Sequence, residues 1–550
     1  MVADRPAASA ADGASGYGPD QLRSAYGLTA AARSDGSGSR VYIVSAYNDA
    51  DIESDLAAYR DEYGLSDCTM ANDCLQVLNQ NGATSPLPPS SPPEDQWSTV
   101  TALLADMVSA LCPHCDITVL EATDDQGNGL YDATKEAGTL GAKFVAVPYG
   151  SRYDPTDNQL DSDFATTGVV YVAAGGDAGY ADGPYWPNVL PNVVSVGGTT
   201  LTQVGSTWSQ TAWSGGTSGC LTSESKPSWQ SGVPSSDCTG RASNDVSAVA
   251  DPNTGVAVYD TPGGGGWILV GGTTNALGII VATFALAGTP APSETPNALL
   301  YARHASLTDV TSGSNGTCTP APLMCNATTG WDGPTGIGTP NGIAAFSPPA
   351  TTLSAPKTAT IKYGKRITLH ATLTNSASHR TISGATVRLL AKQVGSSSYR
   401  TLKTLVTSAR GVASASLHPT SNASYKWSYA GSTANTASTS RPQAVTVDAT
   451  VTLAAKPAKA KLGKKLRLYG TAAPAKAGEK ITVEKRVGKS WKKLGTAKLA
   501  KRKLPNGKTE VGYVLKTKAA KKGKATYRAV VAKTGKNGAG TSKAAVVKIT

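Results

Sequence analysis

The chain has 550 residues and a net charge of +12, and its length exceeds the roughly 100–200 residues of one ordinary domain. Residues 1–350 carry 11 Lys and Arg against 35 Asp and Glu, a balance of −24, whereas residues 351–550 carry 40 against 4, a balance of +36. This change of sign predicts a domain boundary near residue 350. The sequence lacks an uninterrupted run of 18 apolar residues, which excludes an ordinary membrane-spanning helix.

Residues 1–16 are rich in Ala, Ser, Gly and Asp and are expected to be a disordered N-terminal segment. They lack the apolar core of a signal peptide, so we interpret the sequence as the mature form of an exported protein. Together with the eight cysteines of the chain, this start predicts a secreted, extracellular protein.

Eight cysteines, all in the acidic part of the chain, fall in four close pairs: Cys68/Cys74, Cys112/Cys115, Cys220/Cys238 and Cys318/Cys325. An even number at short spacings predicts four local disulfides and an oxidising compartment. The "CPHC" pair, Cys112 and Cys115, has the alternative of a redox or metal-binding dithiol. That alternative needs a thioredoxin-like unit or two further ligands.

From residue 17 to about residue 348, short apolar runs alternate with helical patterns. The apolar runs cover residues 40–47, 116–122, 142–150, 168–177 and 193–198, and "DADIESDLAAYRDEYG" and "EDQWSTVTALLADMVSALC" are helical patterns between them. Fully apolar strands that alternate with helices predict an α/β domain with a parallel sheet covered by helices on both faces. Function in such sheets is expected at the C-terminal ends of the strands.

The segment "GGGGWILVGGTTNALGIIVATFALAG", residues 263–288, predicts an apolar strand, a glycine-rich turn and a buried core helix. A turn of this kind can hold a nucleophilic side chain above the helix N-terminus. The residues available here are Thr273, Thr274 and Asn275.

From about residue 349 the sequence is rich in Thr, Ser, Val and Lys and alternates with a period of two. The segment "YGKRITLHATL", which starts at Tyr363, is repeated as "LGKKLRLYGTA", which starts at Leu462. The repeat predicts two all-β sandwich domains, residues 349–447 and 448–550. They are similar to the immunoglobulin-like modules that follow many secreted bacterial enzymes.

Residues 448–550 hold 28 Lys and Arg against 4 Asp and Glu, a net charge of +24. One interpretation is a solvated surface on which edge lysines prevent aggregation. The other is attachment to a polyanion. The candidates are an anionic cell-wall polymer such as teichoic acid, a phospholipid surface, extracellular DNA and an acidic partner protein. The acidic half of this chain, in the same or another molecule, is a further candidate. No aromatic and basic reading motif is present, so specific nucleic-acid recognition is not expected.

Eight segments of the acidic part carry a family resemblance. They are "GYGPDQLRSAYGL", "ESDLAAYRDEYGL", "DMVSALCPHCDITVLEA", "AAGGDAGY", "PNVVSVGGTTL", "DVSAVADPNTGVAVYD", "DVTSGSNGTC" and "GWDGPTGIGTPNG". In this order, over residues 17–347, they resemble the secreted bacterial sedolisins, which are serine-carboxyl peptidases with a subtilisin-like fold. The resemblance implies a subtilisin-like domain over residues 17–348.

The resemblance implies a Ser-Glu-Asp triad in which Glu and Asp lie four residues apart on one helix face, together with an oxyanion-hole Asp. The Glu position falls at Val100, the Asp position at Leu104 and the Ser position at Thr274, whereas the oxyanion position, Asp177, is retained. Neither Val nor Leu accepts a proton, and Ser45 replaces the Asp of classical subtilisins. We therefore expect a pseudo-peptidase that binds a peptide or protein ligand in the former substrate cleft.

A weak acid endopeptidase is an alternative, because Thr274 can act as a nucleophile if a base lies within hydrogen-bond reach. Asp177 and Glu94 are the candidates for a relocated base. His114 and His304 are not, because His114 lies inside a predicted disulfide loop and His304 follows a helical pattern. A third possibility is a structural subunit of a cell-surface or extracellular complex.

The resemblance also implies one structural Ca²⁺ near the end of the domain. Its ligands would be the side chains of Asp309 and Asp332 and the backbone carbonyls of Val310, Thr328 and Gly330. Calcium takes six to eight oxygen ligands, which two carboxylates, these carbonyls and water can supply. The alternative is an acidic turn without an ion.

Overall fold

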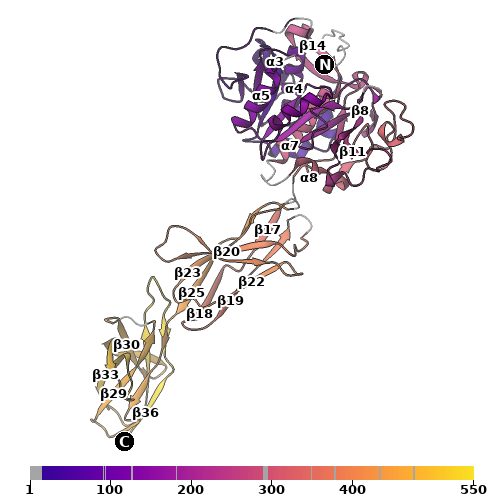
Figure 1. The fold of residues 1–550 in the computed structure, drawn as a ribbon. Coiled ribbons are helices and arrows are strands. Elements are labelled where there is room, and N and C mark those ends of the chain that lie inside the picture. Colours follow the sequence, from indigo (N-terminus) through magenta and orange to yellow (C-terminus); the bar gives the residue numbers. More distant parts are fainter. Residues whose placement is uncertain are drawn as a thin grey trace. The chain divides into compact units, whose positions relative to one another are not determined.

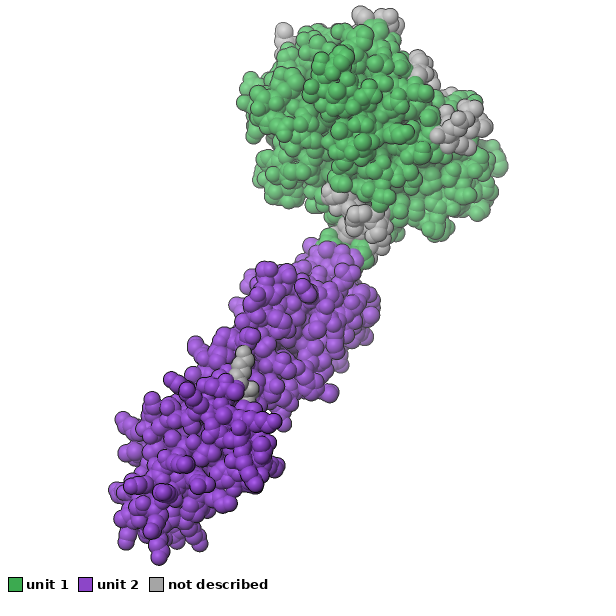
Figure 2. All heavy atoms as spheres, turned by 60° about the vertical axis from the view of Figure 1, so that its left-hand side comes forward, with its two compact units in different colours: residues 1–349, 432–436 green, residues 350–431, 437–550 purple. Residues whose placement is uncertain are grey.

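The computed structural model describes residues 15–90, 92, 95–125, 128–180, 183–288, 295–347, 350–376, 379–432, 435–474 and 477–550. It consists of two compact units, residues 1–349 with 432–436 and residues 350–431 with 437–550, which Figure 2 shows in different colours. Residues 1–14, for which the sequence predicts disorder, and the candidate base Glu94 lie outside the described residues. Within the described parts, none of the helices is long and apolar enough to cross a membrane.

The first unit is built on a sheet whose order is β12-β8-β6-β4-β1-β3-β2, with all seven strands parallel and β9 antiparallel beside β8. Its strands are β1 (Arg40–Ala46), β2 (Leu75–Asn79), β3 (Asp116–Ala122), β4 (Phe144–Val147), β6 (Val170–Ala174), β8 (Val193–Val204), β9 (Thr207–Ala212) and β12 (Val246–Val249). All four residues of β4 and six of the seven in β3 are buried, so both faces of the sheet are covered. This confirms the predicted parallel α/β sheet.

The helices are α1 (Pro19–Ala25), α2 (Thr29–Ser34), α3 (Ile52–Glu62), α4 (Trp97–Leu111), α5 (Gly129–Thr139), α6 (Thr261–Gly264), α7 (Thr273–Ala287) and α8 (Pro296–Ala302) (Figure 1). The helices α4 and α7 pack against each other and against the sheet. Every residue of α4 is buried, and in α7 only the last residue, Ala287, is not. A helix that is buried all round belongs to the core, so this pair forms the centre of the unit.

The predicted strand boundaries hold within one residue at β1 and β3, but the predicted end of β8 at Gly198 is wrong. The strand continues to Val204, and β9 folds back on it as an antiparallel hairpin. The last three residues of this extension, Thr202, Gln203 and Val204, are exposed, so its pattern differs from the fully buried run that precedes it. The apolar run in the sequence therefore identified only the buried first half of β8.

Short pairs complete the unit: β5 (Ser151–Arg152) with β7 (Tyr185–Trp186), β10 (Gly219–Ser225) with β11 (Gly240–Ser243), β13 (Val256–Asp260) with β14 (Gly266–Val270), and β15 (Leu307–Thr308) with β16 (Thr339–Pro340). Its 3₁₀ helices are η1 (Pro155–Phe164), η3 (Ser228–Gln230), η4 (Pro252–Thr254), η5 (His304–Ser306) and η6 (Pro322–Met324).

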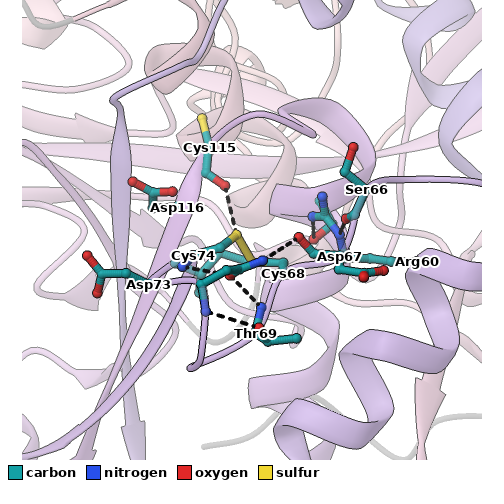
Figure 3. Close-up of a disulfide and its surroundings, with 12 residues drawn as sticks. Arg60, Ser66, Asp67, Cys68, Thr69, Asp73, Cys74, Cys115 and Asp116 are labelled. Carbon is teal, nitrogen blue, oxygen red and sulfur yellow. Dashed lines mark hydrogen bonds between the residues drawn. A yellow bond between two sulfur atoms is a disulfide. The ribbon is translucent and has the colours of Figure 1, made fainter.

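All four predicted disulfides are present, and all eight cysteines are paired. Cys112 and Cys115 are at most 1% exposed and bonded to each other, so this pair is a structural disulfide rather than a metal-binding dithiol. Figure 3 shows the Cys68–Cys74 disulfide, whose Cys74 sulfur lies 3.8 Å from the carbonyl oxygen of Cys115. The Cys112–Cys115 disulfide therefore joins the end of α4 to the start of β3, and the Cys68–Cys74 loop that precedes β2 lies beside it.

The second unit contains two pairs of sheets, consistent with two β-sandwiches. The first sandwich consists of β17 (Thr351–Ser354), β18 (Thr358–Lys362), β19 (Ile367–Asn375), β20 (Thr386–Gln393), β21 (Arg400–Val406), β22 (Val412–Leu417), β23 (Ala423–Tyr429), β24 (Ser438–Thr439) and β25 (Gln443–Asp448). One of its sheets has the order β17-β19-β22, and the other has the order β18-β25-β23-β20-β21 with β24 beside β23.

The second sandwich consists of β26 (Thr450–Val451), β27 (Ala454–Lys456), β28 (Lys459–Ala460), β29 (Lys465–Ala473), β30 (Lys480–Val487), β31 (Ser490–Lys498), β32 (Ala500–Lys503), β33 (Thr509–Lys518), β34 (Gly523–Val531), β35 (Gly540–Thr541) and β36 (Ala545–Ile549). One sheet has the order β26-β29-β33-β32 with β27 also on β29, and the other has the order β28-β36-β34-β30-β31 with β35 beside β34. Each sandwich has its own apolar core, one around Trp427 and one around Tyr513. The two copies of the sequence repeat form the equivalent strands β19 and β29.

Candidate functional site

The positions that the resemblance assigns to the catalytic Glu and Asp are buried on α4, and Leu104 lies in the contact between α4 and α7. Val100 is 5% exposed and Leu104 is 0% exposed. Gly278 lets α7 approach α4 closely, because a Cβ at this position would lie 2.7 Å from Cβ of Met107 and 3.4 Å from Cδ2 of Leu104. The contact is therefore tightly packed and apolar where the family's chemistry needs carboxylates.

Asp106, the acidic residue nearest to these positions on α4, points to another part of the core. Its Oδ2 accepts a hydrogen bond of 3.0 Å from the backbone N–H of Tyr259 in β13. Complete burial raises the pKa of Asp106 well above its usual range, and the negative charges of Asp55 and Asp260 raise it further. The two-residue offset from Leu104 thus turns this carboxyl toward β13 rather than toward the helix face on which Leu104 lies.

The start of α7 is fastened to the loop that follows β6. Oδ1 of Asp177 accepts a 2.8 Å hydrogen bond from the backbone N–H of Thr273, and the N–H of Gly176 donates to the Thr273 hydroxyl at 3.0 Å. A carboxylate in this place satisfies a free N–H of the helix and complements its dipole. The retained Asp177 therefore has a structural role that needs no catalysis.

Thr274, to which the resemblance assigns the serine position, is 5% exposed. Within the described residues its hydroxyl makes no hydrogen bond. The candidate base Asp177 bonds to the neighbouring Thr273, and Glu94 lies outside the described residues. A threonine hydroxyl without a hydrogen-bonded base is a poor nucleophile.

Ser45, at the end of β1, forms a buried hydroxyl pair with Thr101 on α4, with their oxygens 2.5 Å apart. The Thr101 hydroxyl donates to the carbonyl of Trp97 at 2.8 Å, so Ser45 is the donor within the pair. Both side chains are at most 1% exposed. A third position at which the subtilisin-like fold can carry a carboxylate is therefore neutral and satisfied here.

Carboxyl groups do gather nearby, in a cluster that the sequence reading missed: Asp49, Asp55, Glu121 and Asp260. Asp49 follows β1 and Glu121 lies near the end of β3, and Oε1 of Glu121 accepts a 3.0 Å hydrogen bond from the Asp49 N–H. Oδ2 of Asp260 accepts a hydrogen bond from the Thr99 hydroxyl, and both oxygens of Asp55 accept from Thr261. Among the described residues, these four acids make no hydrogen bond to Thr274.

Burial raises the pKa of both Asp49 and Glu121 to about 7. For Asp49 the nearby charges of Asp260, Asp55 and Glu121 add to the effect, and Oδ2 of Asp49 is buried without a partner in the described residues. The sequence signal that could have revealed this cluster is an acidic residue at the end of an apolar strand, such as Glu121 in "DITVLEA". The described residues contain no group of three His, Cys, Asp or Glu arranged to hold a metal ion.

The predicted calcium ligands lie close together. Oδ2 of Asp309 accepts a 2.9 Å hydrogen bond from the Gly330 N–H, and Oδ2 of Asp332 accepts one of 3.0 Å from the Thr328 N–H. Burial raises the pKa of Asp332 to about 7, and the negative charge of Asp309 raises it further. In the described parts of the chain neither carboxylate has an ion-pair partner, so the charge and donor chemistry fit a hard cation.

Comparisons with known proteins agree with this fold. The chain is 28% identical over 378 residues to sedolisin from Pseudomonas sp. (strain 101), and this match covers 61% of this chain and 62% of that protein. It is 29% identical over 342 residues to kumamolisin from Bacillus sp. (strain MN-32), which covers 56% of this chain and 59% of that protein. The chain thus spans about three fifths of the length of these curated relatives.

The solved structure of Pseudomonas sedolisin, a serine-carboxyl proteinase complexed with two molecules of pseudo-iodotyrostatin, matches with a TM-score of 0.50 and 25% identity. The match covers 60% of this chain and 96% of that chain. No protein-family model matches the chain. These findings support homology with the sedolisin peptidases and a subtilisin-like fold for the first unit.

Proposed function

We propose that this chain is a secreted sedolisin-like pseudo-peptidase that binds an extended peptide or protein without cutting it. One observation carries the proposal: Val100 and Leu104 are buried apolar residues of α4, and the Thr274 hydroxyl has no hydrogen-bonded base among the described residues. Loss of triad members typically removes most of a peptidase's rate enhancement. The disulfides support an oxidising, extracellular location.

The decisive experiment is a digest of denatured casein by the full chain at pH 3, 5 and 7, with Pseudomonas sedolisin as the active control. We expect no cleavage above buffer. Binding of fluorescent casein peptides, followed by polarisation, is expected in the same samples and is expected to weaken in the Asp177→Asn variant. Cleavage by the wild-type chain that disappears in Thr274→Ala would falsify the proposal.

A weak acid endopeptidase that uses Thr274 is the second candidate function. The bonds that fasten Asp177 and Gly176 to Thr273 favour it, because they keep the start of α7 in a defined conformation. The digest separates the two functions, because only the peptidase loses an activity when Thr274 is changed to alanine. The third candidate, a structural subunit of an extracellular complex, predicts stable assemblies in place of peptide binding.

We further propose that Asp309 and Asp332, with the carbonyls of Val310, Thr328 and Gly330, hold one structural Ca²⁺. The ion would supply the positive countercharge for the two carboxylates. Calcium is expected to raise the melting temperature of the first unit, and chelation is expected to lower it. The Asp332→Asn variant should lose the response to calcium, and an unchanged response in that variant would exclude this site.

The C-terminal, Lys-rich sandwich is proposed to attach the protein to an anionic cell-wall polymer. Its net charge of +24 over residues 448–550 supports this role, since cationic surfaces concentrate polyanions. Retention of the full chain on isolated bacterial cell walls, and its release by salt, is the expected result.

A further inference from the structure

Cationic side chains face one another across the strands of the second sandwich. In one sheet, Lys456 on β27 lies directly opposite Arg467 on β29, which lies directly opposite Lys516 on β33. All three side chains are exposed. Because directly opposite residues share a face, they form one row across three strands.

The other sheet contains a matching row. Lys459 on β28 lies opposite Lys548 on β36, which lies opposite Lys524 on β34, and all three are exposed. The chain passes from one sheet to the other between Lys456 and Lys459, so the two rows meet at one edge of the sandwich. We call these six residues, Lys456, Arg467, Lys516, Lys459, Lys548 and Lys524, the cationic belt.

Folding does not explain the belt. Like charges directly opposite each other in a sheet are destabilising. Within the described residues, the belt side chains have no salt bridge to an acidic residue. Protection of sheet edges explains only part of it, because Arg467 on β29 and Lys548 on β36 each have a paired strand on both sides.

The first sandwich shows that the architecture does not require such rows. In its strand registers, Arg388 lies opposite Ser428 and Thr404, and Lys392 lies opposite Ser424. Lys362 lies opposite Asp448. The repeated rows are therefore specific to the second sandwich, and their absence from the first sandwich supports a ligand as the reason for them.

We propose that the belt binds a flexible, linear phosphodiester polymer of the polyol-phosphate type found in bacterial cell walls. The inference deepens the attachment role proposed above and rests on it. Neighbouring strands are about 4.8 Å apart, so each row is a line of closely spaced charges that suits a linear series of phosphates. Five of the six belt residues are lysines, which act as point charges without the fixed geometry of a guanidinium.

Nucleic acid fits the belt less well. The belt turns around the edge of a sandwich whose sheets lie about 10 Å apart, whereas duplex DNA bends only over a persistence length of about 50 nm. Single-stranded nucleic acid is bound through aromatic platforms, and the belt contains no aromatic residue. Trp491 on β31 is already covered by Arg528, whose guanidinium carbon lies 4.5 Å from the ring centroid.

The test measures the affinity of the full chain for poly(glycerol phosphate) between 50 and 200 mM salt by biolayer interferometry. About 0.7 counterions are released per phosphate on a single-stranded polyanion, so six contacts predict a salt slope near −4, or about a 250-fold loss. The triple variants Lys456→Gln/Arg467→Gln/Lys516→Gln and Lys459→Gln/Lys524→Gln/Lys548→Gln should each show a slope near −2, or about a 16-fold loss. The matched control is Lys489→Gln/Lys508→Gln/Lys533→Gln, which removes the same charge from exposed positions outside the belt and should stay near −4.

Three results would overturn the proposal: no binding of poly(glycerol phosphate), an equal loss in the control variant, or equal belt-dependent affinity for duplex or single-stranded DNA. Circular dichroism checks that each variant folds, and the single variant Lys524→Gln, with an expected slope change of about 0.7, replaces any triple variant that does not. Failure here leaves the casein result unaffected. Likewise, casein cleavage would remove the pseudo-peptidase proposal without changing polymer binding.

Discussion

The α4–α7 contact of the first unit and the cationic belt of the second differ in how they relate to stability. In the contact, Leu104 and Met107 lie close to Gly278, and this close apolar packing favours folding. In the belt, like charges stand opposite one another, which folding disfavours. Stability therefore explains the first pattern without any present-day activity, whereas the second points to a ligand.

The largest effect is expected when carboxylates are placed at the buried positions 100 and 104 of α4. The double variant Val100→Glu/Leu104→Asp places two acids in an apolar contact without partners, and should destabilise the first unit by roughly 3–5 kcal/mol. Urea unfolding of the full chain, followed by tryptophan fluorescence, measures the loss. Val100→Leu/Leu104→Met keeps the contact apolar and should cost less than about 1.5 kcal/mol. Similar stability of the two variants would contradict a dry contact.

We expect the stability of the first unit to depend on pH through its buried carboxyl cluster. The pKa of both Asp49 and Glu121 is raised to about 7, above the values of about 4 expected in the unfolded chain. The folded state therefore holds more protons between pH 4 and 7, and the stability present below pH 4 is lost as the pH rises to 7. We expect a loss of a few kcal/mol, seen as a falling melting temperature in calorimetry. Asp49→Asn should flatten this dependence, and an unchanged slope would count against the assignment.

Close approach of α7 to α4 can be tested at Gly278. Alanine favours a helix by about 1 kcal/mol over glycine, but its Cβ would lie 2.7 Å from Cβ of Met107. Overpacking should outweigh propensity and give a net destabilisation of about 1–2 kcal/mol. Gly232→Ala is the matched control, because a Cβ there meets no atom within 4 Å. In a Met107→Gly background, which removes the clashing Cβ, Gly278→Ala should cost less than in the wild-type chain, and an equal cost would mean that the strain lies elsewhere.

The sequence predicted what depends on periodicity and spacing: the parallel sheet, the two central helices and the four disulfides. It could not predict the carboxyl cluster, since Asp55, Glu121 and Asp260 are far apart along the chain and only folding brings them to one region. The belt was hidden for a related reason. Lysine content shows the total charge, but strand register decides which lysines face each other.

The smallest effect is a stability change expected in the belt, and it tests directly whether the opposite like charges destabilise the folded state. Lys524→Gln removes one of two like charges opposite Lys548 and should stabilise the second unit by roughly 0.2–1 kcal/mol at 10 mM salt. The gain should vanish at 1 M salt, where the Debye length falls to about 3 Å. Lys489→Gln, in the hairpin between β30 and β31, removes the same charge without an opposite cation and should change stability less. If both variants gain equally, the strain comes from the total charge of residues 448–550, and strand register would no longer distinguish the belt from the other lysines.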